Sequence, residues 1–569
     1  MTETVHTQPI ATPPKRDLAG GAAPQWWRNA VIYQIYPRSF ADGNGDGIGD
    51  LDGVRGRLAY LVKLGVDAIW FTPWYVSPLA DGGYDVADYR AIDPAFGTLA
   101  EAESLIAEAR ALGIRTIVDV VPNHVSDQHP WFRSALETGS GSAERERFWF
   151  RPGHGTGGGE PPNQWLSIFG GRAWTRTTDP GGRPGEWYLH LFSPQQPDLN
   201  WSHPDVRREF EDVLRFWFDR GVAGVRIDSA ALLVKDPGLP ELEDEHGPGQ
   251  HPTVDRDEVH EIYRAWRRIA DGYDDERALV GEIWLPDIDR FARYLRPDEL
   301  HTAFNFDFLG RPWDATSLRA SIDETLGAHE PVAAPATWVL SNHDVTRPVT
   351  RYGRADSSFA FATKQRGVPT DLELGRRRAR AAALLTAALP GSLYIYQGDE
   401  LGLDEVEDLP LHRLQDPIVH RSGGVDPGRD GCRVPLPWAE GDPSFGFSPA
   451  DATNEPWLPQ PAHWGTLTVE HQLADPDSML SLYRSALSLR RAEPDLVRGS
   501  LRWLDAGEDV LAFQRGDGIA CLVNFSAHPI ALPAHASVLL TSVPIDDPAL
   551  PTDAAAWLRL DGHGEMRMT

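Results

Sequence analysis

Cysteine is almost absent from this chain. Only Cys432 and Cys521 occur among 569 residues, and they stand far apart, in no C-x-x-C arrangement. This scarcity excludes the usual cysteine pattern of a structural zinc site and the dense cysteines of a disulfide framework. We expect a reducing compartment, with the cytoplasm as the default location.

Positive charge and long apolar runs are also scarce. The chain has 54 Lys and Arg against 83 Asp and Glu, a net charge of -29. Such a field repels nucleic acid and anionic membranes, so we expect neither as a partner and predict a small neutral substrate. Residues 1–25 form no apolar signal segment and are predicted to be a flexible tail. The longest apolar stretch, 381–396, is interrupted by Pro390-Gly391 and favours a helix, a turn and a strand over a membrane span.

What the chain does have is a regular alternation of short β-branched runs and amphipathic stretches. The predicted strands cover residues 31–36, 66–71, 114–121, 222–227, 278–280, 302–306, 337–340 and 393–396. Helical patterns between them cover residues 99–112, 204–220, 259–270 and 374–388. Alternating strands and helices imply an α/β fold with a parallel sheet, and eight such units imply a closed (β/α)8 TIM barrel.

Three long excursions interrupt this alternation, at residues 125–201, 236–257 and 402–470. We expect the first to be a loop domain inserted after strand 3, and all three to wall a pocket at the catalytic end. A hairpin pattern follows the last helix, so residues 497–569 are predicted to form a C-terminal antiparallel β-domain. The barrel would then comprise residues 26–124 and 202–496.

Three carboxylates stand where three predicted strands end. Asp228 follows the run 222–227, Glu282 follows Gly281 at the end of the next strand, and Asp344 comes shortly after the run 337–340. Each acid alone would be more typical of an ordinary ion pair. Because the carboxyl ends of barrel strands meet at one face, the three together predict one active site.

Five segments, three of which contain these acids, match a known set of motifs. They are Asp119-Val120-Val121-Pro122-Asn123-His124, Gly224-Val225-Arg226-Ile227-Asp228, Gly281-Glu282-Ile283-Trp284, Ser341-Asn342-His343-Asp344 and Gln196-Pro197-Asp198-Leu199-Asn200. Over roughly residues 26–525 the chain resembles the α-amylase superfamily, glycoside hydrolase family 13, in its α-glucosidase and oligo-1,6-glucosidase branch. One motif alone would be weak, but so many in the family's order are unlikely to coincide.

The resemblance implies a retaining double displacement. Asp228 would be the nucleophile, Glu282 the general acid and base, and Asp344 a ligand of sugar hydroxyls, with the first two carboxyls about 5 to 5.5 Å apart. Arg226 lies two residues before Asp228, on the same strand face, and would keep that acid ionised. Glu282 should need a less charged neighbourhood to hold its proton near neutral pH.

The same resemblance implies a closed pocket for one terminal glucose. Asp81, Tyr84, His124, Arg226, His343 and Arg429 are the predicted substrate-binding residues. Tyr84 would be a stacking platform, and an ion pair between Asp81 and an arginine would block further sugar units. We prefer Arg429 for that arginine, although the spacing also allows Arg433. Asp119 and Asn123 are interpreted as structural.

A loop near the N-terminus is similar to the first part of a calcium site. Asp42, Asn44, Asp46, Ile48 and Asp50 place oxygen atoms at alternate positions, with glycine at the sixth. The twelfth position is Gly53 and not a bidentate acid, so the loop departs from an EF-hand. Related glucosidases hold a divalent ion in such a loop, which implies a structural Ca²⁺ or Mg²⁺. The alternative is a Gly/Asp turn without metal. No organic cofactor is expected.

We therefore predict an exo-acting α-glucosidase on short α-glucosides, as a monomer or homodimer. Ser229 occupies a position where relatives that prefer α-1,6 bonds often have valine, which favours α-1,4-linked maltose and malto-oligosaccharides. One alternative is a glucosyl-transferring enzyme or isomerase that forms trehalose or isomaltulose. A second alternative is a non-catalytic transporter partner, which would have lost the carboxylates and gained a membrane anchor.

Overall fold

A computed structural model describes residues 25–179, 181–243, 246–361, 364–441, 444–545 and 549–560. The predicted tail, apart from residue 25, and the last nine residues of the predicted C-terminal domain lie outside these ranges. Within them, no helix is both long enough and apolar enough to cross a membrane.

Eight parallel strands form the central sheet, and all eight were predicted. They are β1 (Val31–Ile35), β2 (Ala68–Phe71), β5 (Arg115–Val120), β9 (Gly224–Ile227), β10 (Ala278–Gly281), β11 (Thr302–Ala303), β12 (Thr337–Val339) and β13 (Ser392–Tyr396). Their order is β11-β10-β9-β5-β2-β1-β13-β12. β11 and β12 stand at the two ends of this order. Asn305 N, just after β11, donates to Thr337 O of β12 at 3.2 Å and so joins these ends. The predicted (β/α)8 barrel is therefore confirmed.

Helices surround the sheet. The longer ones are α1 (Leu51–Leu64), α2 (Leu99–Ala111), α4 (Pro204–Asp219), α5 (Val259–Ala270), α8 (Ala315–His329), α10 (Leu372–Ala388) and α13 (Met479–Ala492). Shorter ones are α3 (Pro130–Thr138), α6 (Ile288–Arg293), α7 (Phe306–Gly310), α9 (Pro348–Tyr352), α11 (Pro417–Arg421), α12 (Val469–Ala474) and α14 (Pro494–Arg498). Local chemistry sets their starts: Thr98 and Glu101 form a capping box on α2, and proline occupies the first turn of α4.

The barrel strands divide their side chains between two cores, as a two-residue period requires. Alternate residues such as Ile32, Trp70 and Val280 pack inside the barrel. Their neighbours along the strands, such as Tyr33 and Ile69, pack outward in the larger core that includes the helices. If this alternation continues past the carboxyl end of a strand, the next inward-pointing side chain lies over the open end of the barrel interior.

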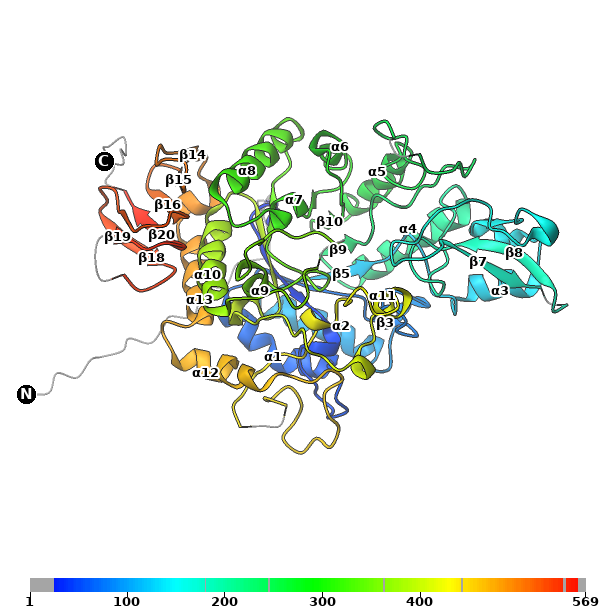
Figure 1. Cartoon of the computed structure of the whole chain (residues 1–569), viewed down its shortest axis with the longest axis horizontal. Helices are drawn as coiled ribbons and strands as arrows, with labels where there is room; N and C mark the ends of the chain where they lie inside the picture. The colour runs from blue at the N-terminus through cyan, green and yellow to red at the C-terminus, as the bar shows by residue number, and fades with distance from the viewer. Residues whose placement is uncertain are drawn as a thin grey trace, which may run out of the picture.

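Two smaller sheets lie at opposite ends of the long axis, with the barrel between them (Figure 1). The inserted segment contains α3 and a sheet of β6 (Phe150–Arg151), β8 (Pro184–Leu189) and β7 (Trp174–Thr178). The C-terminal antiparallel sheet has the order β14 (Leu501–Trp503), β15 (Val510–Arg515), β16 (Ile519–Asn524), β20 (Ala554–Arg559), β18 (Ser537–Thr541). Beside it, β17 (Ile530–Ala531) pairs with β19 (Ala549–Leu550). Trp557 Nε1 donates to Leu384 O of α10 at 3.1 Å, which fixes this sheet on the barrel.

An additional hairpin follows β2 that the sequence did not predict. It pairs β3 (Tyr75–Val76) with β4 (Asp88–Ile92). The loop between these two strands contains Asp81 and Tyr84, so the hairpin brings both residues back over the barrel end.

Candidate active site

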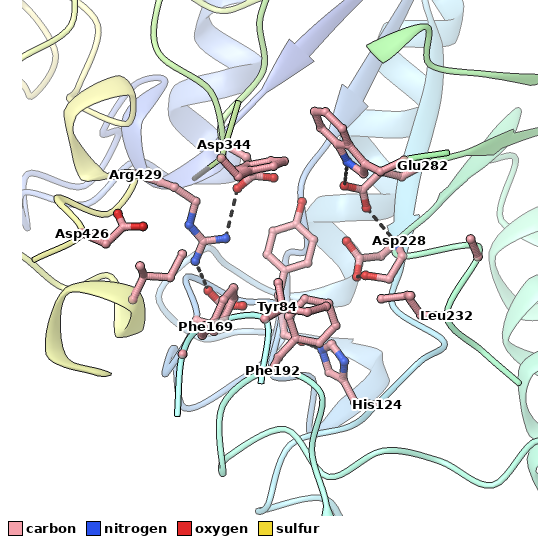
Figure 2. Close-up of a pocket in the computed structure, with 18 of the residues that line it drawn as sticks. Tyr84, His124, Phe169, Phe192, Asp228, Leu232, Glu282, Asp344, Asp426 and Arg429 are labelled. Carbon is pink, nitrogen blue, oxygen red and sulfur yellow. Dashed lines mark hydrogen bonds and ion pairs between the residues drawn. The ribbon is translucent and has the colours of Figure 1, made fainter. Parts of the chain in front are cut away.

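A cavity of about 580 Å³ opens at the carboxyl ends of the barrel strands. Asp228 follows β9, Glu282 follows β10 and Asp344 follows β12, and all three side chains line this cavity. Figure 2 shows Asp228 and Glu282 close together, with Asp344 across the cavity from Asp228. The three acids that were predicted from separate strand ends thus share one site.

Arg226 lies beneath the acids and contacts two of them. Its Nη1 donates to Asp228 Oδ1 at 2.6 Å and to Asp119 Oδ1 at 2.9 Å. Its Nη2 lies 2.8 Å from Glu282 Oε2. The side chain is only 1% exposed, so a single buried guanidinium joins the two carboxylates. The expectation that Glu282 has a less charged neighbourhood than Asp228 is therefore wrong, because Arg226 spans the gap between β9 and β10.

Glu282 nevertheless holds its proton to near neutral pH. Burial raises the pKa of Glu282 to about 7, against the effect of Arg226, and the nearby Asp228 charge adds to the rise. Burial also raises the pKa of Asp228, but Arg226 and the Ser229 hydroxyl oppose it. Two carboxyls beside one cation, one of them protonated near pH 7, are the groups that acid and nucleophilic catalysis at a glycosidic bond require.

Ser229 places two donors on these acids from an unusual backbone conformation. Its φ of 50° is in the left-handed region, which costs a residue with a Cβ about 1 kcal/mol or more. In this conformation Ser229 N donates to Glu282 Oε2 at 2.8 Å, and Ser229 Oγ donates to Asp228 Oδ2 at 2.8 Å. Trp284 Nε1 donates to the other oxygen of Glu282 at 3.1 Å. Both oxygens of Glu282 are thus oriented by the chain that follows the two acids.

Arginines surround Asp344 on the opposite side of the cavity. Arg429 Nη1 lies 3.1 Å and Arg433 Nη2 2.8 Å from Asp344 Oδ1. The pKa of Asp344 is held below its ordinary range, against the effect of burial, by His343 and these arginines. Burial lowers the pKa of His343 itself, so this imidazole is neutral and the two arginines are the effective cations. Asp344 is therefore ionised near neutral pH.

Arg429 also contacts two further carboxylates at the cavity wall. Its Nη2 donates to Asp81 Oδ1 at 2.6 Å, and its Nε donates to Asp416 Oδ2 at 2.7 Å. Arg429 lines the cavity, whereas Arg433 is 2% exposed and does not. Of the two arginines that the spacing allowed, Arg429 is thus the one that pairs with Asp81 at the cavity wall.

The other predicted substrate-binding residues divide into two groups. Tyr84 and His124 line the cavity, whereas Arg226 and His343 lie behind its wall. The His343 ring stacks on Tyr84 at 5.2 Å with an interplanar angle of 3°, so it supports this ring from behind. Burial lowers the pKa of His124 to about 4, which leaves a neutral imidazole beside the cavity. Of these four residues, Tyr84 and His124 are therefore the two that can contact a ligand in the cavity.

A buried ion pair joins the inserted segment to the barrel end. Lys235 Nζ lies 2.7 Å from Asp198 Oδ2, and both side chains are 0% exposed. The same nitrogen donates to Asn123 Oδ1 at 2.5 Å and to Leu232 O at 2.8 Å. Asn123, which was interpreted as structural, thus belongs to the connection that fixes the inserted segment next to His124.

All three excursions line the cavity, as predicted, but the sequence reasoning did not single out most of the residues that do so. Ile168, Phe169, Gly170 and Phe192 come from the first excursion, Val254 from the second, and Ile418, Ser422 and Asp426 from the third. Phe361 and Lys364 come from the connection before α10, which had not been singled out. No local motif marks these residues, because they reach the cavity only through the folding of long loops.

The predicted metal loop is closed by its own backbone. Asp42 Oδ1 accepts from Gly45 N at 2.7 Å, Asn44 Oδ1 from Asp46 N at 2.9 Å, and Asp50 Oδ1 from Gly53 N at 2.7 Å. Oxygen donors of this kind suit Ca²⁺ or Mg²⁺. Among the described residues, however, no three His, Cys, Asp or Glu side chains converge as metal ligands. The metal therefore stays a prediction.

Comparisons with known proteins agree with this geometry. Residues 34–499 match the family described as "Alpha amylase, catalytic domain". A "Probable alpha-glucosidase" of Rhizobium meliloti (strain 1021) is 39% identical over 526 residues, which are 88% of this chain and 89% of that protein. A "Trehalose-6-phosphate hydrolase" of Escherichia coli (strain K12) is 37% identical, over 88% of this chain and 91% of that protein. The solved structure of an isomaltulose synthase from Klebsiella sp. LX3 superposes with a TM-score of 0.83 at 31% identity, covering 95% of this chain and all of that one (100%).

Proposed function

The chain belongs to the α-amylase family and is a glycoside hydrolase, and from this premise we propose that it is a retaining, exo-acting α-glucosidase. It releases glucose from the non-reducing end of short α-glucosides. The observation that supports this most directly is the Asp228–Arg226–Glu282 arrangement at the cavity floor, in which one carboxyl keeps its proton to near pH 7.

In the proposed reaction Asp228 attacks the anomeric carbon while Glu282 donates its proton to the glycosidic oxygen. The aglycone leaves as an alcohol, and a glucosyl ester on Asp228 remains. Glu282, now ionised, takes a proton from water, and the resulting nucleophile displaces Asp228 and releases glucose. Asp344, a fixed carboxylate, accepts hydrogen bonds from sugar hydroxyls throughout both steps.

The exo mode follows from the closed end of the cavity. The ion pairs of Arg429 with Asp81 and Asp416 at this end would block sugar units beyond the terminal one, which supports a site for one glucose unit. The substrate is proposed to be neutral, because Lys364, a cation at the cavity wall, is paired with Asp426 at 2.8 Å. We further propose α-1,4-linked maltose and malto-oligosaccharides as preferred substrates, on the identity of Ser229 beside the nucleophile.

Glucosyl transfer is the second candidate, favoured by the overall likeness to an isomaltulose synthase. The same glucosyl ester would then be intercepted by a sugar hydroxyl instead of water.

A panel of maltose, isomaltose, sucrose and trehalose tests both candidates when the products are identified. We expect glucose from maltose as the fastest reaction, and Asp228→Asn should abolish it. Isomerised disaccharide as the main product from sucrose would favour transfer. Full glucose release by Asp228→Asn would contradict the proposed mechanism altogether.

A further inference from the structure

The backbone directly after Asp228 is held in a conformation that it does not favour. We call residues 229–231 the nucleophile turn. Its first residue, Ser229, has a φ of 50° and supplies both the hydroxyl on Asp228 and the N–H on Glu282. Because the left-handed region costs a serine free energy, contacts from outside the turn must hold it there. Those contacts determine where the two donors point.

The nucleophile turn is held through the peptide groups of its two alanines. Ala230 N donates to Glu282 O at 2.9 Å, and Ala230 O accepts from Tyr263 Oη. Ala231 O accepts from Asp255 N at 2.8 Å. The last of these contacts comes from the end of the second excursion, just before α5 begins.

Asp255 is itself left-handed, with a φ of 54°. Aspartate tolerates this region better than most residues, but the conformation still needs support. Arg290 Nε donates to Asp255 Oδ2 at 2.6 Å, and Arg290 Nη2 donates to Asp255 O at 2.7 Å. Tyr294 Oη donates to the other carboxylate oxygen at 2.9 Å. The carboxylate and the carbonyl of Asp255 are thus both fixed, which sets the direction of the N–H that it donates to Ala231.

The Arg290–Asp255 pair connects the two parts of the chain that carry the catalytic acids. Arg290 belongs to α6, which follows β10 and Glu282, whereas Asp255 lies between β9, which precedes Asp228, and α5. Arg290 is 4% and Asp255 is 7% exposed, so solvent screens the pair little. Neither residue lines the cavity. The pair can therefore influence the reaction only through the backbone that it holds.

We propose that Arg290 and Asp255 are positioning residues for the hydrolytic reaction, and that they hold the nucleophile turn so that Ser229 directs its N–H to Glu282 and its hydroxyl to Asp228. The proposal rests on the proposed glucosidase function, in which these two acids carry out the chemistry. It adds the residues that keep the acids and their donors aligned.

The test is Arg290→Met, assayed on the glucoside that the native enzyme cleaves fastest. We expect kcat to fall about tenfold, with KM changed less than about threefold. Without the donors of Ser229 both acids lose stabilisation of their ionised forms, while Arg226 and Asp344 still face them. Both limbs of the pH profile of kcat/KM should therefore move to higher pH, each by about half a unit or more. A loss of folded protein alone would scale the profile and leave its limbs in place.

Arg145→Met is the matched control. Arg145 is 4% exposed, as Arg290 is, and lies 2.6 Å from a single carboxylate, that of Glu186. It also donates to a backbone carbonyl, Ala135 O, at 2.9 Å. These contacts lie in the inserted segment and not at the nucleophile turn. Its loss should lower the melting temperature to a similar extent and leave both pH limbs unchanged.

A second substitution tests whether Arg290 acts through the turn. Ser229→Gly removes the hydroxyl and should itself lower kcat/KM, but glycine adopts a φ of 50° without steric cost. The turn then needs less support, so Arg290→Met should lower kcat/KM by a smaller factor in the Ser229→Gly enzyme than in the native one.

Arg290→Lys is the conservative variant. It keeps the charge but lacks the planar fork that reaches the carboxylate and the carbonyl of Asp255 together, so we expect a pH shift between those of the native enzyme and Arg290→Met. Thermal unfolding checks that each variant is folded. If Arg290→Met does not fold, Arg290→Lys takes its place in both measurements.

The outcomes separate the proposed function from the positioning role. If the native enzyme cleaves no α-glucoside, the proposed function fails. If it does cleave them and the pH limbs of the Arg290 variants coincide with those of the native enzyme, the function stands and the positioning role is wrong. Equal factors in the native and Ser229→Gly enzymes would overturn the route through Ser229.

Discussion

The buried carboxyl of Glu282 allows a quantitative prediction about stability as well as activity. Its ordinary pKa is 4.5, and burial raises it to about 7. In the pH range between these values the folded protein retains a proton that the unfolded chain has lost. The contribution of Glu282 to the free energy of unfolding must therefore fall as pH rises through this range, because at this group the folded state binds more protons than the unfolded state.

Glu282→Gln removes this cost while keeping the shape of the side chain. At 1.36 kcal/mol for each pH unit, the cost of ionising Glu282 in the folded protein is about 3 kcal/mol above pH 7. The side chain is 12% exposed, so solvent screening reduces this figure only slightly. We expect the variant to gain stability over the native protein progressively from pH 4.5 to pH 7, and the difference to level off beyond.

The assay is a pair of urea titrations, native and variant, repeated across that pH range and followed by tryptophan fluorescence. Subtracting the two free energies of unfolding removes the contribution of the titrating groups that do not interact with Glu282; Asp228 and Asp344, which do, remain part of the difference. Activity supplies the second measurement: kcat/KM of the native enzyme should fall about tenfold per pH unit above pH 7, and Glu282→Gln should lose about 100-fold or more. A stability difference that is flat with pH, or that shrinks as pH rises, would refute the reasoning.

Three further predictions follow from single contacts. Lys235→Met should cost about 3 to 5 kcal/mol in urea unfolding, because it leaves Asp198 buried without its partner; a loss below about 1 kcal/mol would show that the pair is not needed. Arg429→Lys should raise KM for maltose about tenfold, because lysine cannot replace the planar fork that binds Asp416 and directs Nη2 to Asp81; an unchanged KM would contradict this. Chelation with EDTA should lower both the metal content and the melting temperature if the loop 42–50 holds Ca²⁺ or Mg²⁺, and no change in either would rule that ion out.

The barrel could be predicted because its information is local. Each strand is a short apolar run, and the two-residue period that places Arg226 and Asp228 on one face needs no knowledge of the rest of the chain. The acids Asp228, Glu282 and Asp344 then came together because parallel strands in a barrel end at one face. For these residues, position along a strand determines position in space.

The remainder of the site depends on contacts between distant segments. The left-handed conformation of Ser229 has no sequence pattern, since serine seldom adopts it. The contact of Arg226 with Glu282 crosses between two strands and contradicts the expected separation of charges. Phe361 reaches Trp284 from a connection more than 70 residues away in the sequence, and no local rule determines the path of such a loop.

The single guanidinium that joins Asp228 and Glu282 has a consequence for the order of events in the proposed reaction. Once Asp228 is esterified its negative charge is gone, while Arg226 stays 2.8 Å from Glu282. One cause of the raised pKa of Glu282 disappears and the opposing cation remains, so that pKa must drop. The residue that began as an acid is thereby converted into a base at the moment when water has to be activated. Arg226 would thus stabilise ionised Glu282 once Asp228 has lost its charge, which favours the transfer of a proton from water to Glu282 in the second step.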